Sequence, residues 1–68
     1  MSHKPETLGE RLRCLRETAQ LTIPDLSDKS GVAVGTISNV ERGIGDTQIS
    51  TLKKITAALN INISDLDL

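Results

Sequence analysis

The chain has 68 residues, of which 37% are hydrophobic and 25% are charged, a balance that fits one small folded domain and excludes a disordered tail. It contains no Phe, Trp or Tyr, which argues against the aromatic stacking surfaces that bind RNA and single-stranded DNA. The formal net charge is -1 and the basic residues form no dense stripe along the sequence, so any binding of nucleic acid must depend on a few well-placed groups.

Cysteine and histidine occur once each, as Cys14 and His3. A single cysteine cannot form an internal disulfide, and these two side chains do not make a zinc site, so no metal or other cofactor is expected. No His or Asp near Cys14 would activate it as a nucleophile, so no catalytic residue and no enzymatic activity are expected. No apolar run is long enough for a signal peptide or a membrane span, and the chain is predicted to be cytoplasmic.

The first predicted helix follows a short polar start. Residues 1–5 are predicted to be disordered, and residues 6–68 are predicted to form one domain. Thr7 suits the N-cap of a helix because its hydroxyl can accept a hydrogen bond from a backbone N–H of the first turn. The apolar residues that follow share one helical face, which predicts packing against a core: Leu8, Leu12, Leu15 and Ala19.

The second predicted helix begins with the spacing of a capping box, formed by Thr22 and Asp25. Pro24 between them is tolerated in a first helical turn. The helix is expected to end before Gly31, which can adopt the left-handed conformation that releases the chain into a tight turn. Two helices joined by so short a turn must cross steeply, and Val32 is expected to fill the space inside it.

A third helix is predicted from about Ala33 to Arg42, ended by Gly43. A step of about 100° per residue from a buried Ile37 turns Ala33 and Val40 toward the core. The same step turns small and polar residues outward, with two more at the edges of that face: Gly35, Ser38, Asn39 and Arg42, flanked by Val34 and Thr36. Since Ala33 has no hydroxyl, this helix is expected to lack a side-chain cap.

A fourth helix is predicted from about Ile49 to Leu59, with Asn60 as a left-handed terminator. Asn62 and Asp65 repeat the capping-box spacing and predict a last short helix. Its apolar residues are Ile63, Leu66 and Leu68. Because no segment has the alternation of a strand, the sequence predicts an all-α fold of five helices.

The outward face of the third predicted helix carries hydroxyl, amide and guanidinium groups and no bulky apolar residue. Such a face can enter the major groove of DNA and offer hydrogen bonds to the edges of bases. Ser, Thr and Asn are equally common on helices that only face solvent. The residues of this helix by themselves leave both interpretations open.

Three stretches of the sequence resemble the lambda-repressor-like helix-turn-helix family, also described as the Cro or XRE type. They are LGERLRCLRETAQLT, DLSDKSGVAVGTISNVERG and STLKKITAALNINISDL, and together they cover about residues 8–66. The resemblance implies a five-helix domain with its helix-turn-helix at about residues 23–42. It further implies a sequence-specific regulator of transcription, a repressor or a controller, whose third helix reads the major groove of double-stranded DNA.

The resemblance also implies roles for individual residues. The positions that match the base-reading helix are Val34, Gly35, Thr36, Ser38 and Asn39, and the positions that match phosphate contacts are Thr22, Ile23 and Arg42. Glu41 matches a glutamate that pairs with an arginine of the first helix, here Arg16. We expect this ion pair to be buried and structural.

Two departures from the family pattern leave alternatives open. Ile23 stands where many relatives have a glutamine, and it cannot donate a hydrogen bond to a phosphate. Ile44, Gly45 and Asp46 stand where basic residues often follow the third helix. One alternative is a protein-interaction module of the same fold with weak or no DNA binding. Another is that these residues are the DNA-binding end of a longer regulator.

The end of the chain is rich in apolar residues, more than a short terminal segment is expected to bury against its own small core. We predict that they form the interface of a homodimer, and the residues concerned are Ile61, Ile63, Leu66 and Leu68. Two-fold symmetry would suit a palindromic operator whose half-sites lie about 34 Å apart, one turn of DNA.

Overall fold

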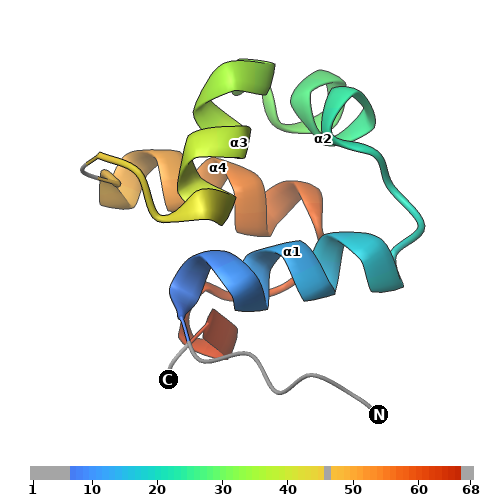
Figure 1. The fold of residues 1–68 in the computed structure, drawn as a ribbon. Helices are drawn as coiled ribbons and strands as arrows, with labels where there is room; N and C mark the ends of the chain where they lie inside the picture. Colours follow the sequence, from blue (N-terminus) through green and yellow to red (C-terminus); the bar gives the residue numbers. More distant parts are fainter. Residues whose placement is uncertain (1–6, 46, 67–68) are drawn as a thin grey trace, which may run out of the picture.

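The computed structural model describes residues 7–45 and 47–66, and it is made of helices joined by short turns (Figure 1). The elements are α1 (Leu8–Thr18), α2 (Ile23–Ser30), α3 (Val34–Arg42), α4 (Ile49–Ala58) and the 3-10 helix η1 (Ile63–Leu66). These residues contain no strand, so the described chain is all-α as predicted. None of its helices has the length and apolar character needed to cross a membrane.

The predicted count of five α-helices needs correction, because the last element is a single turn of 3-10 helix. Four residues are too few to form a regular ladder of α-helical hydrogen bonds, so a short terminal segment adopts the tighter turn. The side chain of Asp65 lies outside the described part of the structure, as do residues 1–6 and Leu68. The predicted disorder of residues 1–5 is therefore not described.

Two helices begin with the side-chain caps that the sequence predicts. The Thr7 hydroxyl accepts a hydrogen bond from the Glu10 backbone N–H at 3.1 Å at the start of α1. At the start of α2, the Thr22 hydroxyl accepts from the Asp25 N–H at 3.2 Å, and the Asp25 carboxylate accepts from the Thr22 N–H at 3.0 Å. The predicted capping box is thus confirmed, and it fixes the first turn of α2.

All four described α-helices end at a residue in the left-handed conformation, including the predicted Gly31 after α2 with φ of 74°, and three of them, α1, α3 and α4, also have the paired hydrogen bonds of a Schellman motif. Gly43 after α3 and Asn60 after α4 have φ of 71° and 59°, which confirms the predicted terminators. Gln20 after α1 is also left-handed, with φ of 61°, and was not predicted. Glutamine is uncommon there because its Cβ crowds the backbone, so no residue type marked this end.

Each element contributes to one apolar core. The buried apolar residues are Leu12, Leu26, Val32, Ile37, Val40, Leu52, Ile55 and Leu66. In Figure 1, α2 and α3 form the upper part, α1 packs against α3, and η1 lies on the opposite side of α1 from α3, where it contacts α1 and α4. The inward position predicted for Ala33 is wrong. Ala33 is exposed because it is the N-cap, with the extended backbone conformation that precedes the helix.

Gly9 brings α1 into backbone contact with the C-terminal end of α3. A Cβ atom on Gly9 would lie 2.4 Å from the backbone oxygen of Val40 and 2.5 Å from that of Glu41. No side chain other than hydrogen fits there without moving one of the helices. Gly9 was given no role in the predictions from the sequence, although a glycine inside a predicted helix can signal close packing.

The uncapped start of α3 provides a test of the local stability of this helix. Ala33 makes no side-chain hydrogen bond at the N-cap. Ala33→Ser is expected to raise the free energy of unfolding by about 1 kcal/mol, because its hydroxyl can accept from an amide of the first turn. Thr7→Ala is the reciprocal control and is expected to lower it by a similar amount. Equilibrium urea unfolding measures both, and an Ala33→Ser variant no more stable than the wild type would contradict the prediction.

Candidate functional site

The outward face of α3 carries the side chains that the sequence analysis assigned to base recognition. Its exposed residues are Val34, Gly35, Thr36, Asn39 and Arg42, and Ser38 is half-buried beside them. Ile37 and Val40 hold the opposite face of the helix in the core. Because these anchors fix the rotation of α3, the outward side chains have a defined direction.

Gly35 leaves α3 with a shallow, open surface near its N-terminus. A Cβ atom at this position would have no other atom within 4 Å, so the glycine is not required by packing inside the chain. The absence of a side chain lets the backbone of α3 come close to whatever faces it. Val34 beside it is 45% exposed and offers an apolar contact at the edge of the same surface.

The N-terminus of α3 is polarised positively and carries no acidic residue. The first turn contains no Asp or Glu, and no side chain caps it. The backbone N–H groups of the first turn have no partner within the helix, and together with the helix dipole they favour a negatively charged group. This end of α3 therefore suits an acceptor such as a phosphate or the edge of a base.

The N-terminus of α2 is less favourable to an anion. Hydrogen bonds from the backbone and the hydroxyl of Thr22 hold the pKa of Asp25 below its usual range, so this exposed carboxylate stays charged at neutral pH. Thr22 is exposed, its hydroxyl accepts from the Asp25 N–H, and its O–H also bonds the Asp25 carboxylate, so it can donate to a phosphate only by turning away from that carboxylate. The apolar side chain of Ile23 is half-buried against the core, so only its backbone N–H can contact a phosphate.

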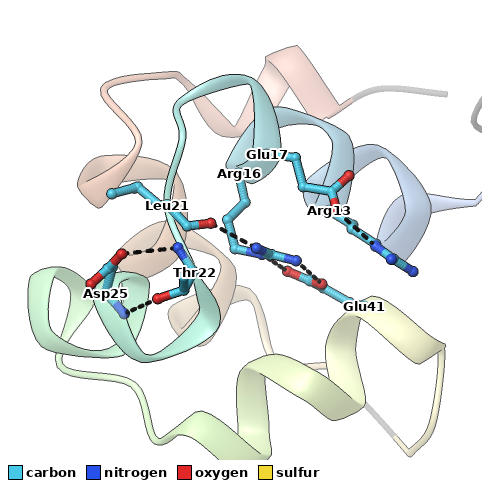
Figure 2. A network of polar contacts seen from close by, with 7 residues as sticks. All are labelled: Arg13, Arg16, Glu17, Leu21, Thr22, Asp25 and Glu41. Atoms are coloured by element: carbon cyan, nitrogen blue, oxygen red, sulfur yellow. Dashed lines mark hydrogen bonds and ion pairs between the residues drawn. The ribbon is translucent and has the colours of Figure 1, made fainter.

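Arg16 and Glu41, the pair that the resemblance implies, form a buried ion pair between α1 and α3 (Figure 2). Arg16 Nε donates to Glu41 Oε2 at 2.7 Å, and Nη2 donates to Oε1 at 3.1 Å. The two residues are 8% and 9% exposed. The hydrogen bonds to the Glu41 carboxylate raise the pKa of Arg16 further above its usual value. The pair is two-pronged, the strongest arrangement of these groups.

Arg16 makes a third contact that the sequence analysis did not foresee. Its Nη1 donates to the backbone oxygen of Leu21 at 2.7 Å, in the turn that joins α1 to α2. A backbone acceptor gives no signal in the residue types. Figure 2 shows the guanidinium between this turn and the Glu41 carboxylate. One side chain therefore joins three elements.

The C-terminal segment is less available for a dimer interface than its composition predicts. Leu66 is 3% exposed and belongs to the chain's own core, so its assignment to a dimer interface is corrected. Ile61 is half-buried against the same core. Ile63 is 36% exposed, and Leu68 lies outside the described residues. The reason is that η1 contacts both α1 and α4, which gives Leu66 more cover than a terminal turn was expected to find.

Two apolar residues that were given no role in a surface contact are more exposed than Ile63. Ile44, directly after the end of α3, is 48% exposed, and Ile49, the first residue of α4, is 64% exposed. They lie at the two ends of the short connection between α3 and α4. An isoleucine in a loop next to two glycines is the sequence signal that could have marked Ile44.

Among the described residues, no group of three or more His, Cys, Asp or Glu side chains could hold a metal ion. Cys14 is a free thiol on the exposed side of α1.

The exposed basic residues of the later helices are few: Lys29, Arg42, Lys53 and Lys54. Arg42 is the only one of them on α3. Attraction of a polyanion to this face therefore depends largely on Arg42 and the backbone amides.

Comparison with known proteins gives consistent matches over most of the chain. A family model described as Helix-turn-helix matches residues 12–66. The HTH-type transcriptional repressor RghR of Bacillus subtilis (strain 168) is 44% identical over 57 residues, which are 82% of this chain and 42% of that protein. The chain thus spans less than half the length of this relative.

Two solved structures superpose closely on the chain. The restriction-modification controller protein C.AhdI from Aeromonas hydrophila has a TM-score of 0.84 and 32% identity, with 87% of this chain and 89% of that chain covered. SinR, the master regulator for biofilm formation, was solved in complex with DNA. It has a TM-score of 0.81 and 28% identity, with 88% of this chain and 97% of that chain covered.

Proposed function

The chain belongs to the helix-turn-helix family, and from this premise we propose that it binds double-stranded DNA in a sequence-specific manner and regulates transcription. The observation that carries the proposal is the outward face of α3, with small and hydrogen-bonding residues and no bulky apolar side chain at its centre. The relatives named as a repressor and a controller, and the neighbour solved with DNA, support the same conclusion. A role as repressor or controller follows, in the cytoplasm and without enzymatic activity.

In the proposed complex, α3 enters the major groove and its exposed residues read the bases. Asn39 can both donate to and accept from an adenine, and Thr36 and Ser38 are shorter donors or acceptors. The methyl groups of Val34 and Thr36 can contact a thymine methyl. Gly35 contributes by its small size, since a long side chain there would hold the helix away from the groove.

Phosphate contacts come from both sides of the reading helix. Arg42 supplies a cation at the end of α3, the Thr22 hydroxyl supplies a donor at the start of α2, and Ile23 contributes through its backbone N–H. The Asp25 carboxylate nearby repels phosphate. We therefore expect modest affinity at physiological salt and a shallow salt dependence, since few phosphates are neutralised.

We further propose that the chain binds as a homodimer to a palindromic operator. After the correction of Leu66, the proposal rests on Ile63 among the described residues, with Ile61 partly accessible beside it. With so small an apolar contact, the chain is expected to dimerise weakly in solution and more firmly when two copies occupy the two half-sites of one operator. Sedimentation with and without the selected DNA tests this, and a monomer in both states at high protein concentration would contradict it.

A second candidate function is a protein-interaction module that has lost most of its DNA affinity. The exposed Ile44 and Ile49 favour it, because they lie where phosphate-binding groups would otherwise follow α3. The discriminating experiment is selection of duplexes from a randomised pool by the wild-type protein at low salt. Enrichment of one sequence supports the first function, and recovery of no preferred duplex supports the second.

The roles of the α3 residues can be separated by two substitutions. Asn39→Ala is expected to weaken binding to the selected duplex by about 1 to 3 kcal/mol and to relax the preference at one base pair. Arg42→Ala is expected to weaken binding to all duplexes alike and to reduce the slope of log affinity against log salt by about one. Repeated selection and salt titration measure these effects. Unchanged base preferences after Asn39→Ala, Ser38→Ala and Gly35→Gln would show that this face does not read DNA.

A further inference from the structure

The Arg16 guanidinium contacts two separate segments of the chain, one through a side-chain carboxylate and one through a backbone oxygen. It forms the two-pronged contact with Glu41 of α3 and donates to the backbone oxygen of Leu21 at 2.7 Å. Arg42 directly follows Glu41, and Thr22 directly follows Leu21. Because a guanidinium is planar and rigid, one group ties together the backbone beside both proposed phosphate contacts.

Leu21 is held by Arg16 in a second way. Its backbone N–H donates to the Arg16 backbone oxygen at 3.2 Å, so the main chain and the side chain of Arg16 both bind Leu21. The capping box between Thr22 and Asp25 then fixes the residues that follow. A displacement of the guanidinium therefore moves the start of α2 relative to the end of α3.

We propose that Arg16 is a positioning residue that sets the separation between the Thr22 and Arg42 phosphate contacts, an inference that rests on the proposed DNA binding. Phosphates along a strand have a regular spacing, so two contacts form together only if the protein groups have a matching separation. Arg16 is 8% exposed and acts through Leu21 and Glu41 rather than by touching DNA. Since basic groups on this face are few, the loss of one of the two phosphate contacts should produce a measurable fall in the affinity for DNA.

The test must separate positioning from stability. The double variant Arg16→Met with Glu41→Leu removes the whole polar link and leaves no unpaired charge, and apolar replacement of a buried ion pair often preserves stability. The probe is the duplex that the wild type selects from a randomised pool, titrated over a salt series at equal folded fractions. We expect roughly tenfold weaker binding or more. We also expect the slope against log salt to fall by roughly one, because the contact expected to be lost is that of the Arg42 cation, and the neutral Thr22 hydroxyl releases no counterion.

Arg16→Lys is a second variant that tests the same point without removing the charge. Lysine can keep its cation near Glu41, but an ammonium cannot reproduce three contacts fixed in one plane. The matched control is Arg13→Lys in the exposed pair with Glu17, whose Nε–Oε2 distance is 3.3 Å. Arg16→Lys is expected to lower both affinity and salt slope, and Arg13→Lys is expected to leave both unchanged.

Each outcome gives a decision. A folded variant of either kind that keeps the wild-type affinity and salt slope overturns the positioning role. Weaker binding with an unchanged slope also overturns it, because a merely structural role would produce that result. If the wild type itself selects no duplex, the proposed function fails and the inference that rests on it fails with it.

Discussion

Replacing Glu41 with alanine is expected to lower the free energy of unfolding by about 3 to 5 kcal/mol, because it leaves the buried Arg16 charge without its partner. The guanidinium would keep only the Leu21 oxygen among its present acceptors. A domain of this length is stable by only about 3 to 10 kcal/mol, so the variant should be largely unfolded or close to it. Since the chain has no Trp or Tyr, far-UV circular dichroism in urea measures the change.

The matched control is Glu17→Ala, which removes the partner of Arg13 in the surface pair on α1. The side chains of this pair are 63% and 55% exposed, and water replaces the lost contact. The expected loss is below about 1 kcal/mol. Equal losses in the two variants, or an unchanged urea midpoint for Glu41→Ala, would show that burial of the Arg16 pair does not stabilise the fold as described.

Gly9→Ala is expected to cost about 3 kcal/mol, although alanine favours a helix more than glycine does by about 1 kcal/mol. The added methyl group would meet the Val40 and Glu41 backbone oxygens at 2.4 and 2.5 Å. Backbone atoms cannot rotate away as a side chain can, so α1 must shift away from α3. That shift also disturbs the Arg16 ion pair, which joins the same two helices. The urea midpoint should fall sharply.

Gly35→Ala provides an unusually close control, because Gly35 is also the second residue of its helix. Its Cβ would meet no other atom within 4 Å. With no collision, only the helix propensity remains, and stability should stay the same or rise by up to about 1 kcal/mol. If Gly9→Ala and Gly35→Ala changed the free energy of unfolding alike, the close contact at Gly9 would not be the cause of the stability change in Gly9→Ala.

Most features that act within a few residues were predicted from the sequence, and the left-handed Gln20 is the exception. The Thr22 and Asp25 capping box and the left-handed Asn60 are interactions of a side chain or a backbone with its near neighbours, so residue type and spacing determine them. The rotation of α3 was also predicted, because Ile37 and Val40 are apolar and the outward positions are polar or small. Only Ala33 was misplaced, since it precedes the helix and does not follow its rotation.

Features that depend on the space between helices came from the tertiary structure alone. The composition of the last residues indicates an apolar surplus, but only the contacts of η1 with α1 and α4 show that Leu66 is covered within the chain. The bond from Arg16 to the Leu21 oxygen ends on a backbone atom, which every residue type possesses.

The sequence by itself determined the four α-helices, the caps of α1 and α2, the ends of α2, α3 and α4, the family, and which side of α3 faces outward, because these follow from local chemistry, apolar periodicity and motif order. The tertiary structure decided which glycine is compressed between helices and which is open, and which backbone oxygen receives the third bond of Arg16. These depend on distances between segments far apart in the chain. Such distances are set by the packing of the whole core and leave no local pattern of residue types.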